Sequence, residues 1–202
     1  GTALTSRPEQ IPAWADYPER YRPVATRLME TFAGFLAHTD HHIKRVIDSL
    51  DTLGIADDTL VSYISGDNGA SAEGTAHGAW SAPSFQNGVH EEPEWLLEHL
   101  DDFGTGRCEN HFNVGWAWAL DSPFQWMKQV ASHFGGTRNA MALSWPKRIA
   151  DRGGLRTQFH HVIDLAPTIY ELVGIDAPAS VNGIQQMPMH GVSMAYSFDD
   201  KS

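Results

Sequence analysis

A long amphipathic pattern that leads through a glycine into a short apolar run constrains the fold more than any other feature of this chain. Apolar residues recur every three or four positions over residues 23–53, which predicts one helix with a buried face. That face consists of Val24, Leu28, Phe32, Leu36, Ile43, Val46, Ile47 and Leu50. Gly54 is expected to end the helix as its C-cap. Residues 60–65 then predict a buried strand, and a helix that leads into a strand is typical of α/β folds.

An acid and an amide follow this strand inside a glycine turn, Gly66-Asp67-Asn68-Gly69. Ligands of open α/β sheets gather beyond the carboxyl ends of the strands. Carboxylate and amide oxygens suit Ca²⁺ or Mg²⁺. Asp67 and Asn68 are therefore candidate metal ligands. A second interpretation stays open, because Asn-Gly and Asp-Gly are also ordinary surface turns.

A long loop follows the turn. Residues 69–115 are rich in Gly, Ser, Glu, His and Asn, apart from a short helical stretch over about residues 93–100. Loops of this length inside a compact domain are usually functional. We expect this loop to wall a pocket.

Three further elements are predicted in the last 80 or so residues of the sequence. A helix is expected over residues 122–133 and a strand over residues 140–145. A last helical pattern covers residues 158–173. Pro167 lies inside that pattern, so it either kinks the helix or marks the start of a shorter helix capped by Asp164.

Composition excludes several classes of partner. The formal net charge of −11 over 202 residues opposes binding to nucleic acid or to an anionic membrane surface. No apolar run approaches the length of a membrane span. Cys108 is the only cysteine, which excludes an internal disulfide framework. We therefore expect a soluble globular protein.

Two histidines on the first predicted helix have the spacing of a metal pair. His38 and His42 stand at i and i+4, a spacing that can hold zinc. A third ligand and a Glu base in the intervening turn are absent from this pattern. Packing or hydrogen bonding along the helix face is the favoured interpretation.

Several segments, taken in order, resemble bacterial arylsulfatases of the alkaline-phosphatase-like superfamily. Residues 66–74 are similar to the late metal-binding motif of those enzymes. Four other segments resemble arylsulfatase segments in the same order, namely residues 35–43, 122–129, 133–139 and 159–168. The resemblance covers nearly the whole chain. It implies that residues 1–202 are a partial sulfatase catalytic domain, without the N-terminal part that bears the nucleophile and without the C-terminal subdomain.

The resemblance also implies a fold and a site. The fold would be α/β, part of an alkaline-phosphatase-like sandwich with a mainly parallel sheet and helices on both faces. Asp67 and Asn68 would bind Ca²⁺, or Mg²⁺, together with acids from an upstream strand. Lys128 would contact the sulfate and the departing oxygen, as both a catalytic and a substrate-binding residue. Asn68 favours the sulfatase branch, since relatives with two zinc ions tend to carry His there.

The chain departs from the family pattern in two respects. Sulfatases make formylglycine from the first residue of a Cys/Ser-x-Pro-x-Arg motif, and this sequence contains no such motif. Phe134 stands where many family members have Glu. We expect a parent protein that hydrolyses small-molecule sulfate esters, with formylglycine in the remainder of its own catalytic domain, in the bacterial cytoplasm or periplasm. This segment alone is expected to be inactive. A phosphate or phosphonate monoester hydrolase and a non-catalytic calcium-stabilised binding module are the alternatives.

Overall fold

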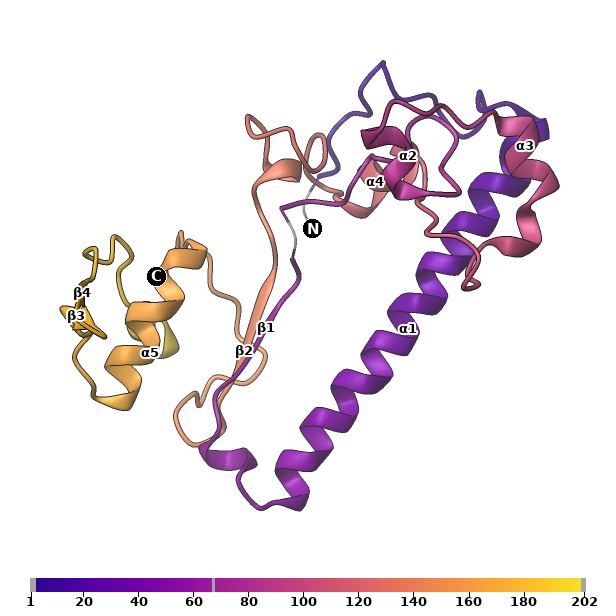
Figure 1. Cartoon of the computed structure of the whole chain (residues 1–202). Helices are drawn as coiled ribbons and strands as arrows, with labels where there is room; N and C mark the ends of the chain where they lie inside the picture. Colours follow the sequence, from indigo (N-terminus) through magenta and orange to yellow (C-terminus); the bar gives the residue numbers. More distant parts are fainter. Residues whose placement is uncertain (1–2, 67, 201–202) are drawn as a thin grey trace. The chain divides into compact units, whose positions relative to one another are not determined.

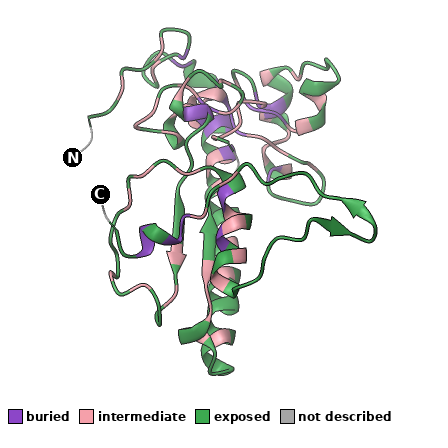
Figure 2. Ribbon diagram, turned by 90° about the vertical axis from the view of Figure 1, so that its left-hand side faces the viewer, coloured by how far each residue is buried: buried purple, intermediate pink, exposed green. Residues whose placement is uncertain are grey.

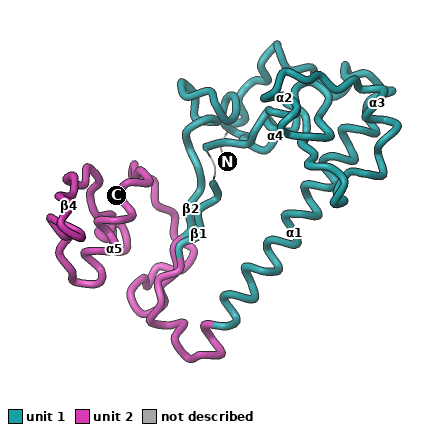
Figure 3. The backbone as a smooth tube through the Cα atoms, viewed as in Figure 1, with its two compact units in different colours: residues 1–49, 62–142 teal, residues 50–61, 143–202 magenta. Residues whose placement is uncertain are grey.

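The chain forms two compact units in the computed structural model, which describes residues 3–66 and 68–200. The first unit comprises Gly1–Ser49 and Ser62–Ala142, and the second comprises Leu50–Val61 and Leu143–Ser202 (Figure 3).

The predicted long helix is present as α1, Arg22–Thr52, preceded by the 3₁₀ turn η1, Glu19–Tyr21 (Figure 1). Gly54 ends it as predicted, with a left-handed φ of +67°. The N–H of Gly54 donates to Asp51 O at 3.0 Å, and the N–H of Ile55 donates to Leu50 O at 3.1 Å. This pair of bonds is the Schellman arrangement, which satisfies carbonyls that a helix end otherwise leaves unpaired.

The predicted buried face of α1 is only partly buried. Val24 and Leu28 are buried, whereas Leu36 is 50% exposed and Val46 is 62% exposed. The later turns of the helix are accordingly coloured as exposed or intermediate (Figure 2). The prediction of one continuous buried face is therefore wrong beyond the first three turns, because the core of the first unit lies at the N-terminal end of the helix.

Short helices follow along the chain, namely α2 (Ala82–Gln86), α3 (Pro93–Glu98), η3 (Leu100–Asp102) and α4 (Val114–Leu120). The core consists of residues of α1, α3 and α4 together with loop residues, and Leu28, Leu96 and Phe103 are fully buried in it. The indole of Trp116 on α4 donates to Ala25 O on α1 at 2.9 Å. The helical stretch predicted near residues 93–100 is thus confirmed.

Both predicted strands form, as β1 (Val61–Ile64) and β2 (Met141–Ser144), which pair in a two-stranded sheet. The N–H of Ser65 donates to Ala140 O, and the N–H of Lys147 donates to Asp57 O, both at 3.0 Å, so the strands run antiparallel. The strands are not buried, since Tyr63 and Ile64 are 45% and 43% exposed. The described residues therefore contain helices and small antiparallel sheets, and the mainly parallel sheet stays a prediction.

The helix predicted over residues 122–133 does not form. Trp126 and Gln129 have φ values of +63° and +77°, which are incompatible with a right-handed helix. The N–H groups of the segment are used elsewhere, as in the bond from Lys128 N to Ala70 O. Residues 122–133 form turns, followed by η4, Phe134–Gly136.

The second unit contains α5, Leu165–Val173, preceded by η5, Val162–Asp164. Of the two alternatives for the last helical pattern, the shorter helix is correct. Asp164 occupies its N-cap position, although the carboxylate accepts from His161 N at 2.8 Å and Val192 N at 2.9 Å instead of from α5. The hairpin of β3 (Ser180–Val181) and β4 (Ile184–Gln185) and the turn η6 (Ala195–Phe198) follow.

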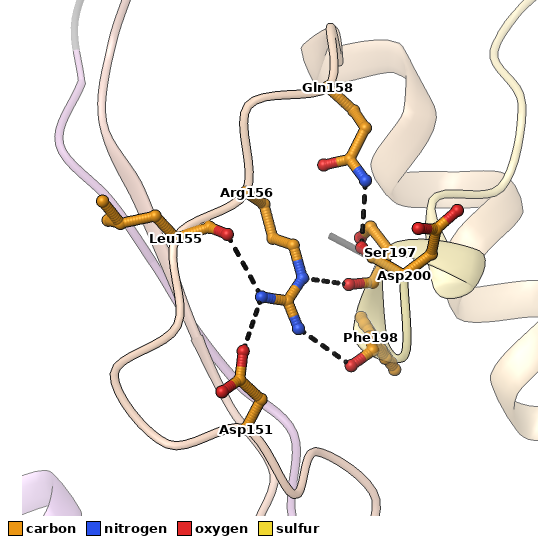
Figure 4. Close-up of polar contacts among 7 residues, drawn as sticks. All are labelled: Asp151, Leu155, Arg156, Gln158, Ser197, Phe198 and Asp200. Carbon is orange, nitrogen blue, oxygen red and sulfur yellow. Dashed lines mark hydrogen bonds and ion pairs between the residues drawn. The ribbon is translucent and has the colours of Figure 1, made fainter. Parts of the chain in front are cut away.

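Arg156 fixes the end of the second unit (Figure 4). Its Nη1 donates to Asp151 Oδ2 at 2.9 Å, its Nη2 donates to Phe198 O at 3.1 Å, and its Nε donates to Ser197 O. Nearby, Gln158 Nε2 donates to Asp200 O at 2.9 Å. The guanidinium of Arg156 therefore connects Asp151 to Ser197 and Phe198.

Candidate active site

The loop after β1 carries the two predicted metal ligands. Asp67 lies outside the described residues. Asn68 is exposed, so its side-chain amide is open to solvent. The turn continues through Gly69, whose φ is +92°. A Cβ at Gly69 would overlap Gly135 O and lie 2.7 Å from Lys128 N, so this position accepts only glycine.

Three contacts hold this loop, and one of them joins it to the segment that carries Lys128. Lys128 N donates to Ala70 O at 3.1 Å. Ala70 N donates to the Asp121 carboxylate, 3.0 Å from each oxygen. Gly69 N donates to Asn139 Oδ1 at 3.2 Å. The half-buried Lys128 is therefore hydrogen-bonded through its backbone to Ala70, which lies two positions after Asn68 in the sequence.

The backbone around Lys128 is unusual and closely packed. Trp126 and Gln129, on either side of Lys128, both have left-handed φ values, which cost energy for residues other than glycine. A Cβ at Gly135 would overlap Trp126 O. Gly135 and Gly136 thus allow the chain to fold closely back on the Lys128 segment.

Asp121 is a site residue that sequence reasoning missed. It directly follows α4 and is half-buried. Burial raises the pKa of its carboxyl group, and the hydrogen bond from Ala70 N lowers that pKa by a smaller amount. The sequence carries no local signal for this role, since the contact joins residues that are 51 positions apart. Asp121 orients the candidate metal loop through the backbone of Ala70.

The described residues supply only part of a metal site. Over residues 3–66 and 68–200, no group of three or more His, Cys, Asp or Glu side chains is arranged to hold a metal ion. Asn68 offers an amide oxygen, which is the donor type that a hard cation prefers. The donor type therefore fits Ca²⁺ or Mg²⁺, while the described part of the chain does not complete a ligand set.

Phe134, the departure from the family pattern, has a defined environment. It is 61% exposed, and its ring lies 5.9 Å from that of Phe124 in an edge arrangement. The guanidinium of Arg138 lies 5.2 Å from the Phe124 ring and 5.6 Å from the Phe134 ring. Arg138 therefore makes cation–π contacts with both rings.

Trp116 and Trp118 line an apolar pocket of about 180 Å³ in the first unit, together with Trp14 and Tyr17. Trp14 and Tyr17 stack with ring centroids 5.8 Å apart. Ala76, Asn113 and Val114 of the long loop and α4 complete part of its wall. The loop therefore contributes to a pocket, as expected from its length.

Comparison with known proteins identifies the class. The family model described as Sulfatase matches residues 6–175, so the chain belongs to the sulfatase family. Membership of this family implies an alkaline-phosphatase-like α/β fold.

Two curated relatives agree with this membership. The chain is 28% identical over 181 residues to a protein named arylsulfatase from Klebsiella aerogenes, covering 88% of this chain and 36% of that protein. It is 29% identical over 166 residues to an uncharacterized sulfatase of Schizosaccharomyces pombe, covering 82% of this chain and 28% of that protein. The chain thus spans about a third of the length of these relatives.

No helix within the described residues is both long enough and apolar enough to cross a membrane.

Proposed function

We propose that this chain is part of the catalytic domain of an enzyme that hydrolyses sulfate monoesters of aryl or otherwise bulky alcohols. The observation that carries the proposal is the hydrogen bond from Lys128 N to Ala70 O, because it joins the Lys128 segment to the loop of Asp67 and Asn68. Similarity to the Klebsiella aerogenes protein named arylsulfatase supports the aryl ester as substrate class.

Lys128 would bind the sulfate group and neutralise the negative charge that develops on the departing oxygen. An ammonium group stabilises such charge more strongly where water is partly excluded, and Lys128 is half-buried. The bond to Ala70 O and the close packing of Gly135 hold the backbone below this side chain. Because the backbone of Lys128 is held in place, positioning its ammonium group costs less free energy.

Asp67 and Asn68 would hold Ca²⁺, or Mg²⁺, through carboxylate and amide oxygens. When bound, the cation would supply electrostatic stabilisation of the sulfate oxygens. Asn139 and Asp121 would act as positioning residues, because they accept the N–H groups of Gly69 and Ala70 and so orient the loop.

The rest of the site, including formylglycine, would come from sequence outside these 202 residues. The exposed apolar residues of β1 support this, since Tyr63 and Ile64 are both more than 40% exposed. An isolated two-stranded sheet is marginally stable in water. We infer that β1 and β2 pack against the remainder of the catalytic domain, where they would join a larger, mainly parallel sheet.

The test uses the full-length protein, with formylglycine verified by mass spectrometry and 4-nitrophenyl sulfate as substrate. Replacing Lys128 by Ala should lower kcat/KM by about 10²–10³-fold, the range for loss of one group that stabilises developing charge. Lys147→Ala is the matched control, because Lys147 is an exposed lysine paired with Asp58, and its activity should equal that of the wild type.

The outcomes separate the alternatives. Absence of 4-nitrophenol release from the sulfate, with formylglycine present, would contradict the proposal. Faster release from 4-nitrophenyl phosphate would instead indicate a phosphate or phosphonate monoester hydrolase. A non-catalytic calcium-stabilised module would hydrolyse neither ester. Ca²⁺ would still stabilise it, and Asn68→Ala would abolish that stabilisation.

A further inference from the structure

A pair of histidines on α1 lies outside the candidate active site. His38 and His42 are both exposed, and they stand one helical turn apart. Their Nε2 atoms are 3.1 Å apart, and their ring centroids are 4.4 Å apart. The i, i+4 spacing in the sequence therefore places two imidazole nitrogens face to face, and hydrogen bonding along the helix, the favoured sequence interpretation, describes this arrangement.

The distance between the two nitrogens is also that of a chelate. Imidazole nitrogens bind Zn²⁺ at about 2.0–2.1 Å, so two of them on one ion lie about 2.8–3.4 Å apart for angles between roughly 90° and 109°. The observed 3.1 Å falls within this range. A metal ion could therefore replace the shared hydrogen with little change in the position of either ring.

Arg45 determines which nitrogen carries the hydrogen in the absence of metal. Arg45 Nη1 lies 2.9 Å from His42 Nδ1. A guanidinium only donates hydrogen bonds, so His42 Nδ1 accepts and the hydrogen of His42 resides on Nε2. His42 Nε2 then donates to Nε2 of His38. Metal binding at Nε2 would move this proton to Nδ1 and would break the bond to Arg45.

We propose that His38 and His42 form a surface site for a divalent transition-metal ion, with water in its remaining coordination positions. The Irving–Williams order predicts that Cu²⁺ binds more tightly than Zn²⁺. This site takes nitrogen ligands and is separate from the oxygen-ligand site at Asp67 and Asn68, so it does not depend on the proposed function.

The position of the pair on α1 suggests what the ion would do. Phe32 is the last residue of the helix that packs against the core, and residues 33–38 are all exposed. The two ligands converge only while the intervening turn is helical. A bound ion would therefore stabilise α1 at the point where packing against the core ends, because binding to the folded form alone raises stability.

The test is titration of Cu²⁺ and Zn²⁺ into the protein by calorimetry, with excess Ca²⁺ present to occupy oxygen-ligand sites. We expect saturable binding of one transition-metal ion at this pair. Replacing His38 or His42 by Gln should lower the affinity by at least about tenfold, since even outer ligand partners are worth that much. His41→Gln is the matched control, because His41 is a neighbouring exposed histidine outside the pair, and it should leave the affinity unchanged.

Arg45→Met provides a test with the opposite sign. It removes a nearby positive charge and the hydrogen bond that Arg45 donates to His42 Nδ1, which keeps the hydrogen of His42 on Nε2. Cu²⁺ should therefore bind severalfold more tightly. The electron paramagnetic resonance spectrum of bound Cu²⁺ should show two equivalent nitrogen ligands in the wild type and one in His38→Gln. Equal affinity in the wild type, His38→Gln and His42→Gln, or a spectrum without paired nitrogens, would overturn the proposal. Circular dichroism checks that each variant keeps its helix content.

Discussion

The two compact units of this chain are stabilised by different kinds of contact. In the first unit the core is apolar, and Phe103, Leu28 and Leu96 are fully buried. In the described part of the second unit, half of the buried residues are polar, and these are Asp164, Thr168 and Ser197. The first unit therefore depends on filling a volume, whereas the second depends on satisfying specific donors and acceptors.

This difference predicts different responses to mutation. An apolar core loses stability in proportion to the side-chain volume removed. A unit held by polar contacts loses stability when removal of one hydrogen-bonding partner leaves the others unpaired, even if the side-chain volume is kept. Four substitutions test this contrast.

The largest effect should come from Phe103→Ala, because Phe103 is fully buried. Loss of its ring and the resulting cavity should lower the free energy of unfolding by about 3–5 kcal/mol, measured by urea denaturation. Phe85→Ala is the control, since Phe85 is 47% exposed. An equal loss in the two variants would mean that the first unit lacks the core described above.

Arg156→Met should have the next largest effect. The substitution keeps the aliphatic stem but removes the donors to Asp151, Ser197 and Phe198. We expect a loss of about 2–3 kcal/mol and faster amide hydrogen exchange in residues 195–200. Arg152→Met, at an exposed arginine, should stay within about 0.5 kcal/mol of the wild type. Unchanged exchange at residues 195–200 would show that the guanidinium does not anchor this end.

Asp164→Asn should cost about 1–2 kcal/mol at neutral pH. The N–H groups of His161 and Val192 hold the pKa of Asp164 below its usual value. The pKa of Asp164 is therefore lower in the folded state than the unfolded value of about 3.9. Its contribution to the free energy of unfolding is present above about pH 3.9 and is lost as the pH falls through the folded-state pKa. The difference between variant and wild type should thus shrink in acid. A constant difference from pH 7 to pH 3 would contradict this.

The smallest effect should come from His77, in the first unit. Burial lowers its pKa, and its Nδ1 lies 2.9 Å from the hydroxyl of Tyr17. Because the folded state favours the neutral ring, the contribution of His77 to stability is fully present above the unfolded pKa of about 6.5 and declines as the pH falls below it. His77→Gln should remove this small slope between pH 7.5 and pH 5.5 in urea denaturation. His90→Gln, at an exposed histidine, should keep it.

Local patterns in the sequence were sufficient to predict α1, β1 and β2 but not their burial. The spacing of apolar residues and Gly54 predicted α1, and short apolar runs predicted β1 and β2. Whether an apolar face is buried depends on what packs against it, and the exposed Val46 shows that periodicity alone does not reveal this. The segment around Lys128 was mispredicted as a helix because left-handed residues such as Trp126 have no local signature.

The site was predicted in part for the same reason. A motif resemblance singled out Asn68 and Lys128, and the fold brings their segments together through Ala70. Asp121 was missed because its role is visible only once Ala70 N is seen to donate to it across 51 positions of sequence. Long-range contacts of this kind carry no periodic pattern, so local reasoning cannot find them.

The close approach of Gly69 to Gly135 has a consequence for the tolerance of this region to sequence variation. Each glycine is required independently, since a Cβ at Gly69 overlaps the carbonyl oxygen of Gly135, and a Cβ at Gly135 overlaps that of Trp126. No second replacement can compensate, because the obstructing atoms belong to the main chain, which every amino acid shares. A randomised library selected for folding should therefore retain glycine at both positions, while neighbouring exposed residues diversify.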